Sequence, residues 1–215
     1  MKMIDISWPI SEHMTAYKDK KVVVVSHTKI FERDHARESV VTLGSHSGTH
    51  VDAPSHFLAE GSAIDALDVT KIIGKAQVVD CTAVEEKITE NVLRGEKIEQ
   101  STIVLLKTKN SLLSENASFK RDFVYLDDSG ARYLVSLGVR VVGIDYLGIE
   151  RNQPGHETHQ CLLGRGIPII EGLRLDGVAA GMYFLICLPL AYQGLEAAPA
   201  RAVLVSYDKL QRMLT

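Results

Sequence analysis

The 215-residue sequence has only three cysteines, Cys81, Cys161 and Cys187, and they are widely spaced. An odd number at such spacing excludes a disulfide framework, and no pair has the close spacing of a cysteine-type zinc site. We therefore interpret all three as small buried hydrophobic residues. The alternative for Cys161, which lies near His159, is a catalytic nucleophile, but no local pattern supports that role.

Positive charge is scarce as well, since 24 Lys and Arg residues stand against 27 Asp and Glu residues, for a formal net charge of −3. The most basic run, Lys-Asp-Lys-Lys at 18–21, is interrupted by an acid. Nucleic acids and anionic membrane surfaces bind clusters of positive charge. We therefore expect no nucleic acid and no membrane among the partners, and a small molecule as the substrate.

The N-terminus lacks the apolar stretch of a signal peptide, so we expect a cytoplasmic protein. The uncharged stretch 177–195 is interrupted by Gly181, Pro189 and Gly194, whereas a membrane helix needs about 20 predominantly apolar residues. We interpret 183–188, within this stretch, as a strand buried on both faces. A subunit interface would explain the apolar stretch equally well.

Short runs rich in β-branched residues, bounded by Gly, Pro, Asp or Ser, predict eight strands. These are 22–31, 39–43, 76–80, 102–107, 139–144, 167–170, 183–188 and 202–205. Helices are expected at 89–94, 129–137, 159–163 and 207–214, and the second is the firmest because Asp127 can cap it and Gly138 stops it. No linker or repeat interrupts the pattern, which predicts a single sheet-dominated α/β domain over 1–215.

The window 46–56 concentrates side chains that bind metals. His46, His50, Asp52 and His56 share these eleven residues, and imidazole nitrogens and carboxylate oxygens are the ligands of a borderline divalent metal. All four positions are even, so an extended chain would aim them the same way. Bends at Gly48 and Pro54 would wrap the segment around one point. A structural zinc site is usually rich in cysteine, which favours a catalytic metal here.

Other cofactor motifs are missing. The helical His-Glu-x-x-His motif is absent, because in the run at 156–159 the second histidine comes one residue too soon. Neither a Gly-x-Gly-x-x-Gly run nor a P-loop occurs, so nucleotide use is not expected.

The run His-Ser-Gly-Thr-His-Val-Asp-Ala-Pro-Ser-His at 46–56 resembles the H-x-G-T-H-x-D-x-P-x-H signature of the cyclase family of metal-dependent hydrolases. That family includes bacterial kynurenine formamidases and isatin hydrolases. Weaker similarities to the family occur elsewhere in the chain, in the order in which the family has them, at 5–7, 138–145, 159–171, 188–190 and 198–202. The resemblance implies a sheet-dominated three-layer β/β/α (swivelling-type) single domain that forms a homodimer or homotetramer, with the N-terminal region reaching a neighbouring subunit's site.

The resemblance also implies roles that the residues alone do not separate. His46, His50 and Asp52 would hold one metal, and Asp52 and Glu171 would bridge to a second that His159 completes. His56 would be the general acid/base rather than a ligand. The metals are expected to be two zinc ions, with manganese as the alternative. Without the family, Glu171 would be interpreted as an exposed carboxylate, and His156 competes with His159.

The substrate is predicted less directly. A metal that lowers the pKa of water, together with a histidine acid/base, suits hydrolysis of an N-formyl aromatic amine such as N-formylkynurenine. Kynurenine formamidases carry a stacking Trp where this chain has Tyr17, so another cyclic amide, lactam or ester is a second possibility. A metal-binding protein without turnover is a third. Trp8 and Phe57 are assigned either to the pocket wall or to core packing.

Overall fold

The computed structural model describes residues 3–21, 23–151 and 153–206. Their strands are β1 (Met3–Asp5), β2 (Val24–Lys29), β3 (Glu38–Thr42), β4 (His50–Asp52), β5 (Ile73–Asp80), β6 (Lys87–Ile88), β7 (Ile103–Lys107), β8 (Tyr125–Leu126), β9 (Val141–Ile144), β10 (Ile169–Glu171), β11 (Gly181–Pro189) and β12 (Ala197–Ser206). Their helices are α1 (Phe31–Asp34), α2 (Glu90–Arg94), α3 (Asp128–Ser136) and α4 (Glu157–Leu163). Single 3-10 turns include η1 (Tyr17–Asp19) and η2 (Pro54–His56).

The main sheet closes on itself. Within the described residues, seven strands form a ring in the order β12, β11, β5, β7, β9, β10, β4 and back to β12, and β1 pairs with β12 beside β4. The pairs from β5 through β10 are parallel, and the remaining pairs of the ring are antiparallel. The sheet-dominated α/β class is therefore confirmed. The three-layer swivelling arrangement is not, because the sheet closes through β4.

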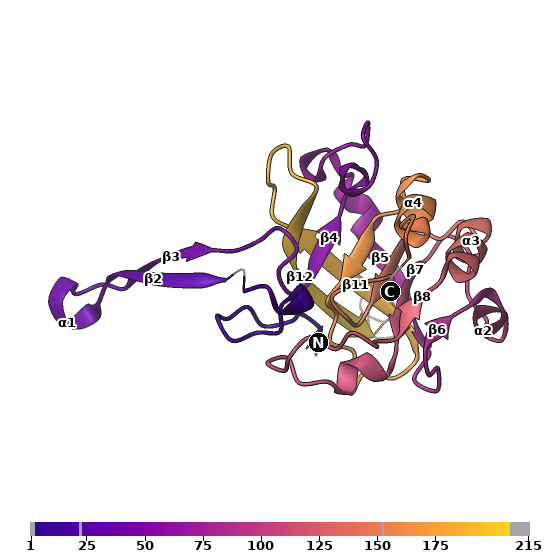
Figure 1. Cartoon of the computed structure of the whole chain (residues 1–215), viewed down its shortest axis with the longest axis horizontal. Helices are drawn as coiled ribbons and strands as arrows, with labels where there is room; N and C mark the ends of the chain where they lie inside the picture. Colours follow the sequence, from indigo (N-terminus) through magenta and orange to yellow (C-terminus); the bar gives the residue numbers. More distant parts are fainter. Residues whose placement is uncertain (1–2, 22, 152, 207–215) are drawn as a thin grey trace, which may run out of the picture.

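Two apolar clusters lie on opposite faces of the ring, as strand β7 illustrates. Ile103 and Leu105 belong to the inner cluster, whereas Val104 and Leu106 belong to the cluster beneath α2, α3 and α4. This alternation follows from the two-residue period of a strand, and it explains why β7 is apolar on both faces. Figure 1 shows the three helices together on one side of the sheet.

Two of the predicted helices occur where capping residues mark them. The side chain of Thr89 accepts a hydrogen bond from the N–H of Val92 at the start of α2, and Asp127 caps α3 in the same way. The expected turn at 159–163 is the second half of α4. The helix expected at 207–214 lies outside the described residues.

Strand β11 corrects one expectation. It has a hydrogen-bonded neighbour on each side, β12 and β5, but only Leu185 and Cys187 along it are fully buried, and Leu188 is 45% exposed. Its outer face is less covered than that of β7, so it is not buried on both faces. No helix in the described part of the chain is both long and apolar enough to cross a membrane.

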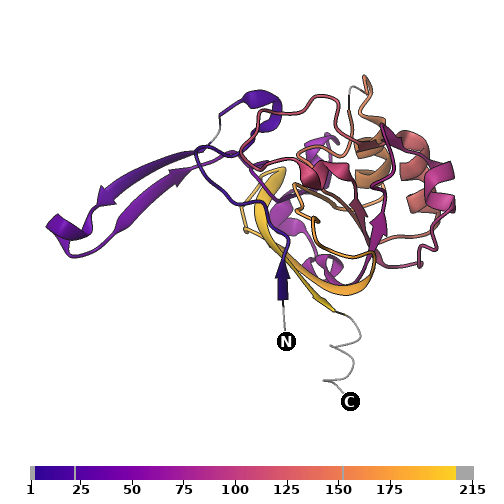
Figure 2. The same cartoon turned by 90° about the horizontal axis from the view of Figure 1, so that it is seen from below.

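A two-stranded hairpin of β2 and β3 projects from the body of the protein, with α1 at its tip. Figures 1 and 2 show it extended in two perpendicular views. The chain enters it after η1 and leaves it just before the 46–56 window. Several of its large apolar side chains are about half exposed, namely Val24, Ile30, Phe31, Val40 and Val41.

Candidate metal centre

Strands β4 and β10 bring three of the predicted ligands together. His50 and Asp52 are two residues apart on β4, so their side chains leave the same face. Glu171 is the direct partner of His50 in the antiparallel pair of β4 and β10. His50 Nε2 lies 3.4 Å from a Glu171 carboxylate oxygen and 3.5 Å from Asp52 Oδ1. All three residues are buried.

The two outer histidines of the window reach the cluster through bends rather than through an extended chain. The expectation of a broadly extended segment is correct only for His50–Asp52. Gly48 has φ +62°, a conformation that favours glycine, and the turn there places His46 Nδ1 3.0 Å from Asp52 Oδ1. The 3-10 turn η2 returns His56 to the same side, so the ring centres of His46 and His56 are 4.2 Å apart.

The fifth predicted ligand, His159, comes from α4. Its Nε2 lies 3.7 Å from Asp52 Oδ2 and 3.4 Å from Glu171 Oε1. The structure therefore places His159, and not the competing His156, against the carboxylates of Asp52 and Glu171. The side chain of His156 is 51% exposed and contacts Glu150 instead.

Glu150 has no counterpart among the predicted residues. It is buried, its Oε2 accepts the backbone N–H of His159 at 3.2 Å, and its Oε1 lies 3.1 Å from His159 Nδ1. A second unpredicted acid, Glu196, lies 3.2 Å from His46 Nε2. Neither carboxylate stands in a recognisable motif, and only the fold brings each to its histidine.

Several buried polar atoms of the cluster lack a hydrogen bond. They include His50 Nε2 and both carboxylate oxygens of Asp52. An unpaired buried carboxylate is costly, so such atoms require a partner. Three sets of ligand atoms lie within 4.8 Å of one another in the described part of the chain, namely Glu150–His156–His159 and the two that share Asp52, His46–Asp52–His56 and His50–Asp52–Glu171. The donor set of imidazoles and carboxylates fits a divalent metal, and Asp52 belongs to two of the three sets.

The carboxylates and imidazoles also shift one another's pKa. Burial alone would raise the pKa of Asp52, but the contacts with His159 and His46 hold it well below its usual value. Burial likewise opposes the charge on His50, yet Glu171 and Asp52 raise the pKa of His50 to about 9. Protons on the imidazoles thus balance the acids in the metal-free protein, and metal binding would displace them.

His56 differs from its neighbours in its electrostatics. Burial lowers the pKa of His56 below its ordinary value, with the charges of His46 and His159 acting in the same direction. The imidazole is therefore neutral at pH 7, a state in which it can accept a proton. Its ring centre lies 5.6 Å from that of His159, at the edge of the cluster.

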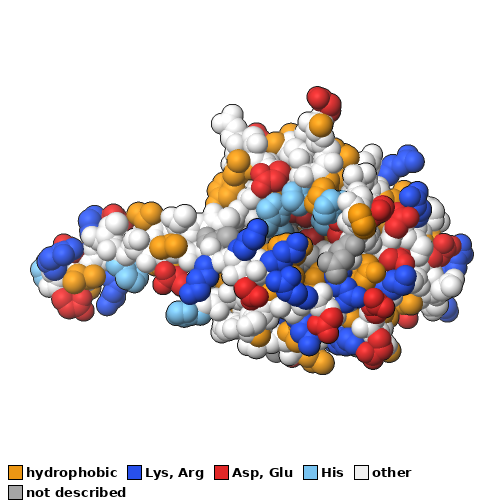
Figure 3. Space-filling view, in the orientation of Figure 1, with side chains coloured by type: hydrophobic (Ala, Val, Ile, Leu, Met, Phe, Trp, Pro, Cys, Tyr) orange, Lys and Arg blue, Asp and Glu red, His pale blue; other side chains and the backbone are white. Residues whose placement is uncertain are grey.

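The cluster opens into a pocket with a volume of about 420 Å³. Figure 3 shows histidine side chains around this hollow, acidic groups within it, and Lys and Arg side chains beside it. Tyr17 and Phe57, two of the predicted substrate contacts, line the pocket, together with Leu147. Trp8 does not. It is 2% exposed, and its indole N–H donates to the carbonyl oxygen of Glu115, which favours the packing alternative.

The interpretation of the cysteines as buried residues is correct for Cys81 and Cys187 but not for Cys161, which is only partly buried. Cys81 and Cys187 are buried, and Cys161 lines a separate surface pocket beside Arg132 and Arg165. Burial raises the pKa of the Cys161 thiol, which opposes a role as nucleophile.

Comparisons with known proteins identify the family of this chain. The Cyclase family model matches residues 4–151. A kynurenine formamidase from Geobacillus thermodenitrificans is 33% identical over 207 residues, which cover 94% of this chain and 96% of that protein. Cyclase-like protein 1 from Arabidopsis thaliana is 37% identical over 79% of this chain and 70% of its own length. The structure of a predicted metal-dependent hydrolase from Bacillus stearothermophilus has 39% identity and a TM-score of 0.84, and the match covers 94% of this chain and 97% of that one. The chain therefore belongs to the Cyclase family of metal-dependent hydrolases.

Proposed function

We propose that this protein hydrolyses the amide bond of an N-formyl aromatic amine, such as N-formylkynurenine, to formate and the free amine. The observation that carries the proposal is the buried Asp52 carboxylate, whose oxygens have imidazoles on two sides and no hydrogen bond. The similarity to kynurenine formamidase over nearly the whole chain supports the choice of substrate.

In this proposal His46, His50 and Asp52 hold one zinc ion, and Asp52, His159 and Glu171 hold a second, with manganese as the alternative. The bound metals would lower the pKa of water and polarise the substrate carbonyl. The chain supplies the acid/base. His56 Nε2 or Nδ1 takes a proton from the attacking water and passes it to the nitrogen of the leaving amine. Phe57 and Leu147 form the apolar wall that helps to exclude bulk water.

Zinc- or manganese-loaded protein with N-formylkynurenine tests the reaction, and His50→Ala serves as the blank. We expect metal-dependent turnover that is lost in the variant. His56→Ala should keep both metals and lose about 10²-fold or more of the activity, as expected for a lost acid/base. Loss of metal in His56→Ala would instead make His56 a ligand. Metal binding without turnover of any amide or ester would leave a non-catalytic metal-binding protein.

A second candidate is hydrolysis of another cyclic amide, lactam or ester at the same site. The observation in its favour is Tyr17, which stands where the resemblance leads us to expect a stacking Trp and which is 44% exposed at the pocket. A substrate panel that includes N-formylkynurenine, simple formanilides, a lactam and an aryl ester separates the two.

We also propose that the protein works as a homodimer in which the hairpin of β2 and β3 packs on a second copy. The projection of the hairpin and its half-exposed apolar side chains support this, because a monomer gains nothing by exposing them. Phe31→Ser with Val40→Ser should shift the mass measured by light scattering from dimer to monomer, and an unchanged mass would contradict the proposal.

A further inference from the structure

A second cavity adjoins the metal pocket. Its volume is about 210 Å³, and it shares Tyr17, His46 and Leu147 with the metal pocket. The rest of its wall is mostly apolar or backbone, from Met14, Ala16 and the turn at 44–48. An apolar cavity of about 150 Å³ holds a benzene molecule, so this cavity is large enough for one aromatic ring. We call it the side chamber.

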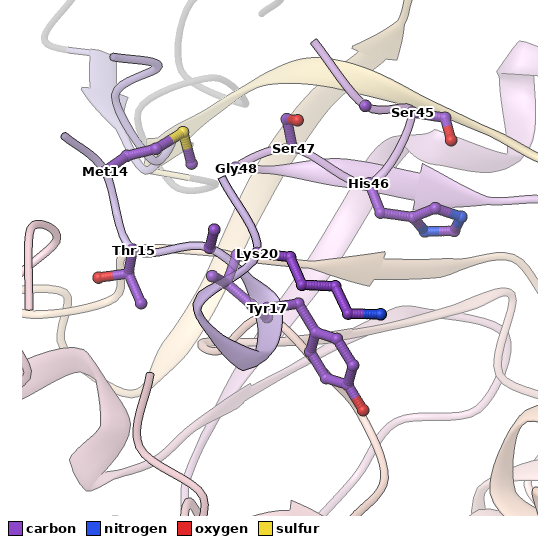
Figure 4. Close-up of a pocket in the computed structure, with 11 residues that line it drawn as sticks. Met14, Thr15, Tyr17, Lys20, Ser45, His46, Ser47 and Gly48 are labelled. Atoms are coloured by element: carbon purple, nitrogen blue, oxygen red, sulfur yellow. The ribbon is translucent and has the colours of Figure 1, made fainter. Parts of the chain in front are cut away.

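One cation stands on the wall of the side chamber. Lys20 lines it, and in Figure 4 the side chains of Lys20, Tyr17 and His46 leave the backbone toward the same side. The Lys20 ammonium has no acid or aromatic partner in the described part of the chain. By contrast, Lys18 lies 5.0 Å from the centre of the Tyr17 ring, and Lys29 pairs with Glu38 at 2.7 Å.

The turn that carries Lys20 is fixed at some energetic cost. Lys18 and Asp19 have φ of +54° and +59°, a backbone conformation that costs a non-glycine residue about 1–3 kcal/mol. Hydrogen bonds hold the turn in place, because Asp19 Oδ1 accepts the N–H of Phe119 at 2.7 Å and Thr15 Oγ1 donates to Ala117 O at 2.8 Å. The backbone at Lys20 is thus held in place by the fold, and its exposed side chain lines the side chamber.

The charges on the wall of the side chamber indicate which substrates can use Lys20. No carboxylate is among the described residues that line it, and Lys20 is the one Lys or Arg side chain among them. An anionic substituent on the substrate would therefore be attracted to the Lys20 ammonium. A ring in the side chamber would leave its scissile amide on the His46 side, where the two cavities meet.

We propose that the side chamber is the subsite for an aromatic ring carrying an anionic group, and that Lys20 binds the anion. This rests on the proposed hydrolase function. The preferred substrate class is therefore an N-acylated aromatic acid rather than a neutral anilide.

The three ring isomers of N-formylaminobenzoate, each compared with its neutral N-formylaminobenzamide isostere, test the proposal in metal-loaded protein. For at least one isomer we expect kcat/KM to favour the anion by about fivefold, the scale of one solvent-exposed charge pair. Lys20→Met should abolish the preference. Lys21→Met, which removes the same charge from a residue that lines neither cavity, should keep it. The preference should also weaken with added salt.

Binding of benzenesulfonate separates this subsite from the proposed reaction, because it requires no turnover. Titration should give a dissociation constant about fivefold higher for Lys20→Met than for Lys21→Met. Lys20-dependent binding without hydrolysis of any anilide would refute the reaction and keep the subsite. Hydrolysis with equal anion preference in both variants would overturn the subsite and keep the reaction.

Discussion

Glu150 offers a strict test of how this site is held together. Its carboxylate accepts the backbone N–H of His159 at 3.2 Å and lies 3.1 Å from the Nδ1 of the same residue. With a proton on Nδ1, the lone pair of Nε2 is left for a metal, and Nε2 already faces Asp52 and Glu171. Removing the carboxylate should therefore weaken metal binding without removing a ligand.

A carboxylate that hydrogen-bonds to a metal-bound histidine typically contributes about 10- to 100-fold to the metal affinity, or about 1.4–2.7 kcal/mol. We expect a loss of metal affinity in this range when Glu150 is replaced. Glu150→Gln keeps the shape of the side chain and one hydrogen-bond acceptor, so we expect a loss of metal affinity near the lower end of this range. Glu150→Ala loses both contacts, so we expect the upper end. Glu157→Gln is the matched control, because Glu157 is an exposed acid on α4, the helix that carries His159, and belongs to none of the candidate metal-binding groups.

A zinc titration against a chromophoric chelator measures the affinities, and ¹⁵N shifts of labelled histidine report the tautomer of His159. The reasoning predicts weaker binding of one metal equivalent and a mixture of His159 tautomers in Glu150→Gln. Unchanged affinity for both equivalents, with His159 in one tautomer, would show that Glu150 does not position the ligand.

Three further outcomes follow from the structure. Gly172→Ala should lower the free energy of unfolding by at least about 2 kcal/mol and weaken metal binding, because a Cβ at this φ of +68° would lie 2.3 Å from the carbonyl oxygen of Gly48. Urea titration measures the free energy of unfolding, and a variant as stable as the wild type would contradict the prediction. Burial raises the pKa of Cys81 and Cys187 to about 12, above the value of about 9 in an unfolded chain. The free energy of unfolding should therefore fall as the pH rises from about 9 to 12, and neither thiol should react with iodoacetamide at pH 8 unless the protein unfolds. Tyr17→Trp should raise kcat/KM for N-formylkynurenine if stacking at this wall limits binding, and an unchanged value would move the substrate to the wider panel.

The sheet was largely predictable because its long strands carry a dense apolar signal. All eight predicted strands exist, with ends shifted by a few residues. Four strands were not predicted: β1, β4, β6 and β8. Each is two or three residues long, which is too short to show the two-residue alternation of apolar and polar side chains that indicates a strand. β4 is also polar at two of its three positions, so its pattern indicated a metal site and not a strand.

The candidate site was predictable only where its residues are adjacent in sequence. The window at 46–56 supplied four of its side chains, and the family resemblance was needed to add His159 and Glu171. Glu150 and Lys20 carried no local signal, since each acquires its neighbours through contacts between distant segments. Trp8 illustrates the reverse case, in which a residue type suited to a pocket is used for packing.

The closure of the ring has a consequence for the order of events during folding. β4 is only three residues long and gains hydrogen-bonded neighbours on both sides, β10 and β12, from segments more than 110 positions further along the chain. A polypeptide emerging from the ribosome can present the histidines of the 46–56 window early, but it cannot clamp them between two strands until β12 is synthesised. High-affinity metal binding should therefore begin only when β12 has joined the sheet. The ion would then stabilise a ring of strands that has already closed, rather than nucleate its folding.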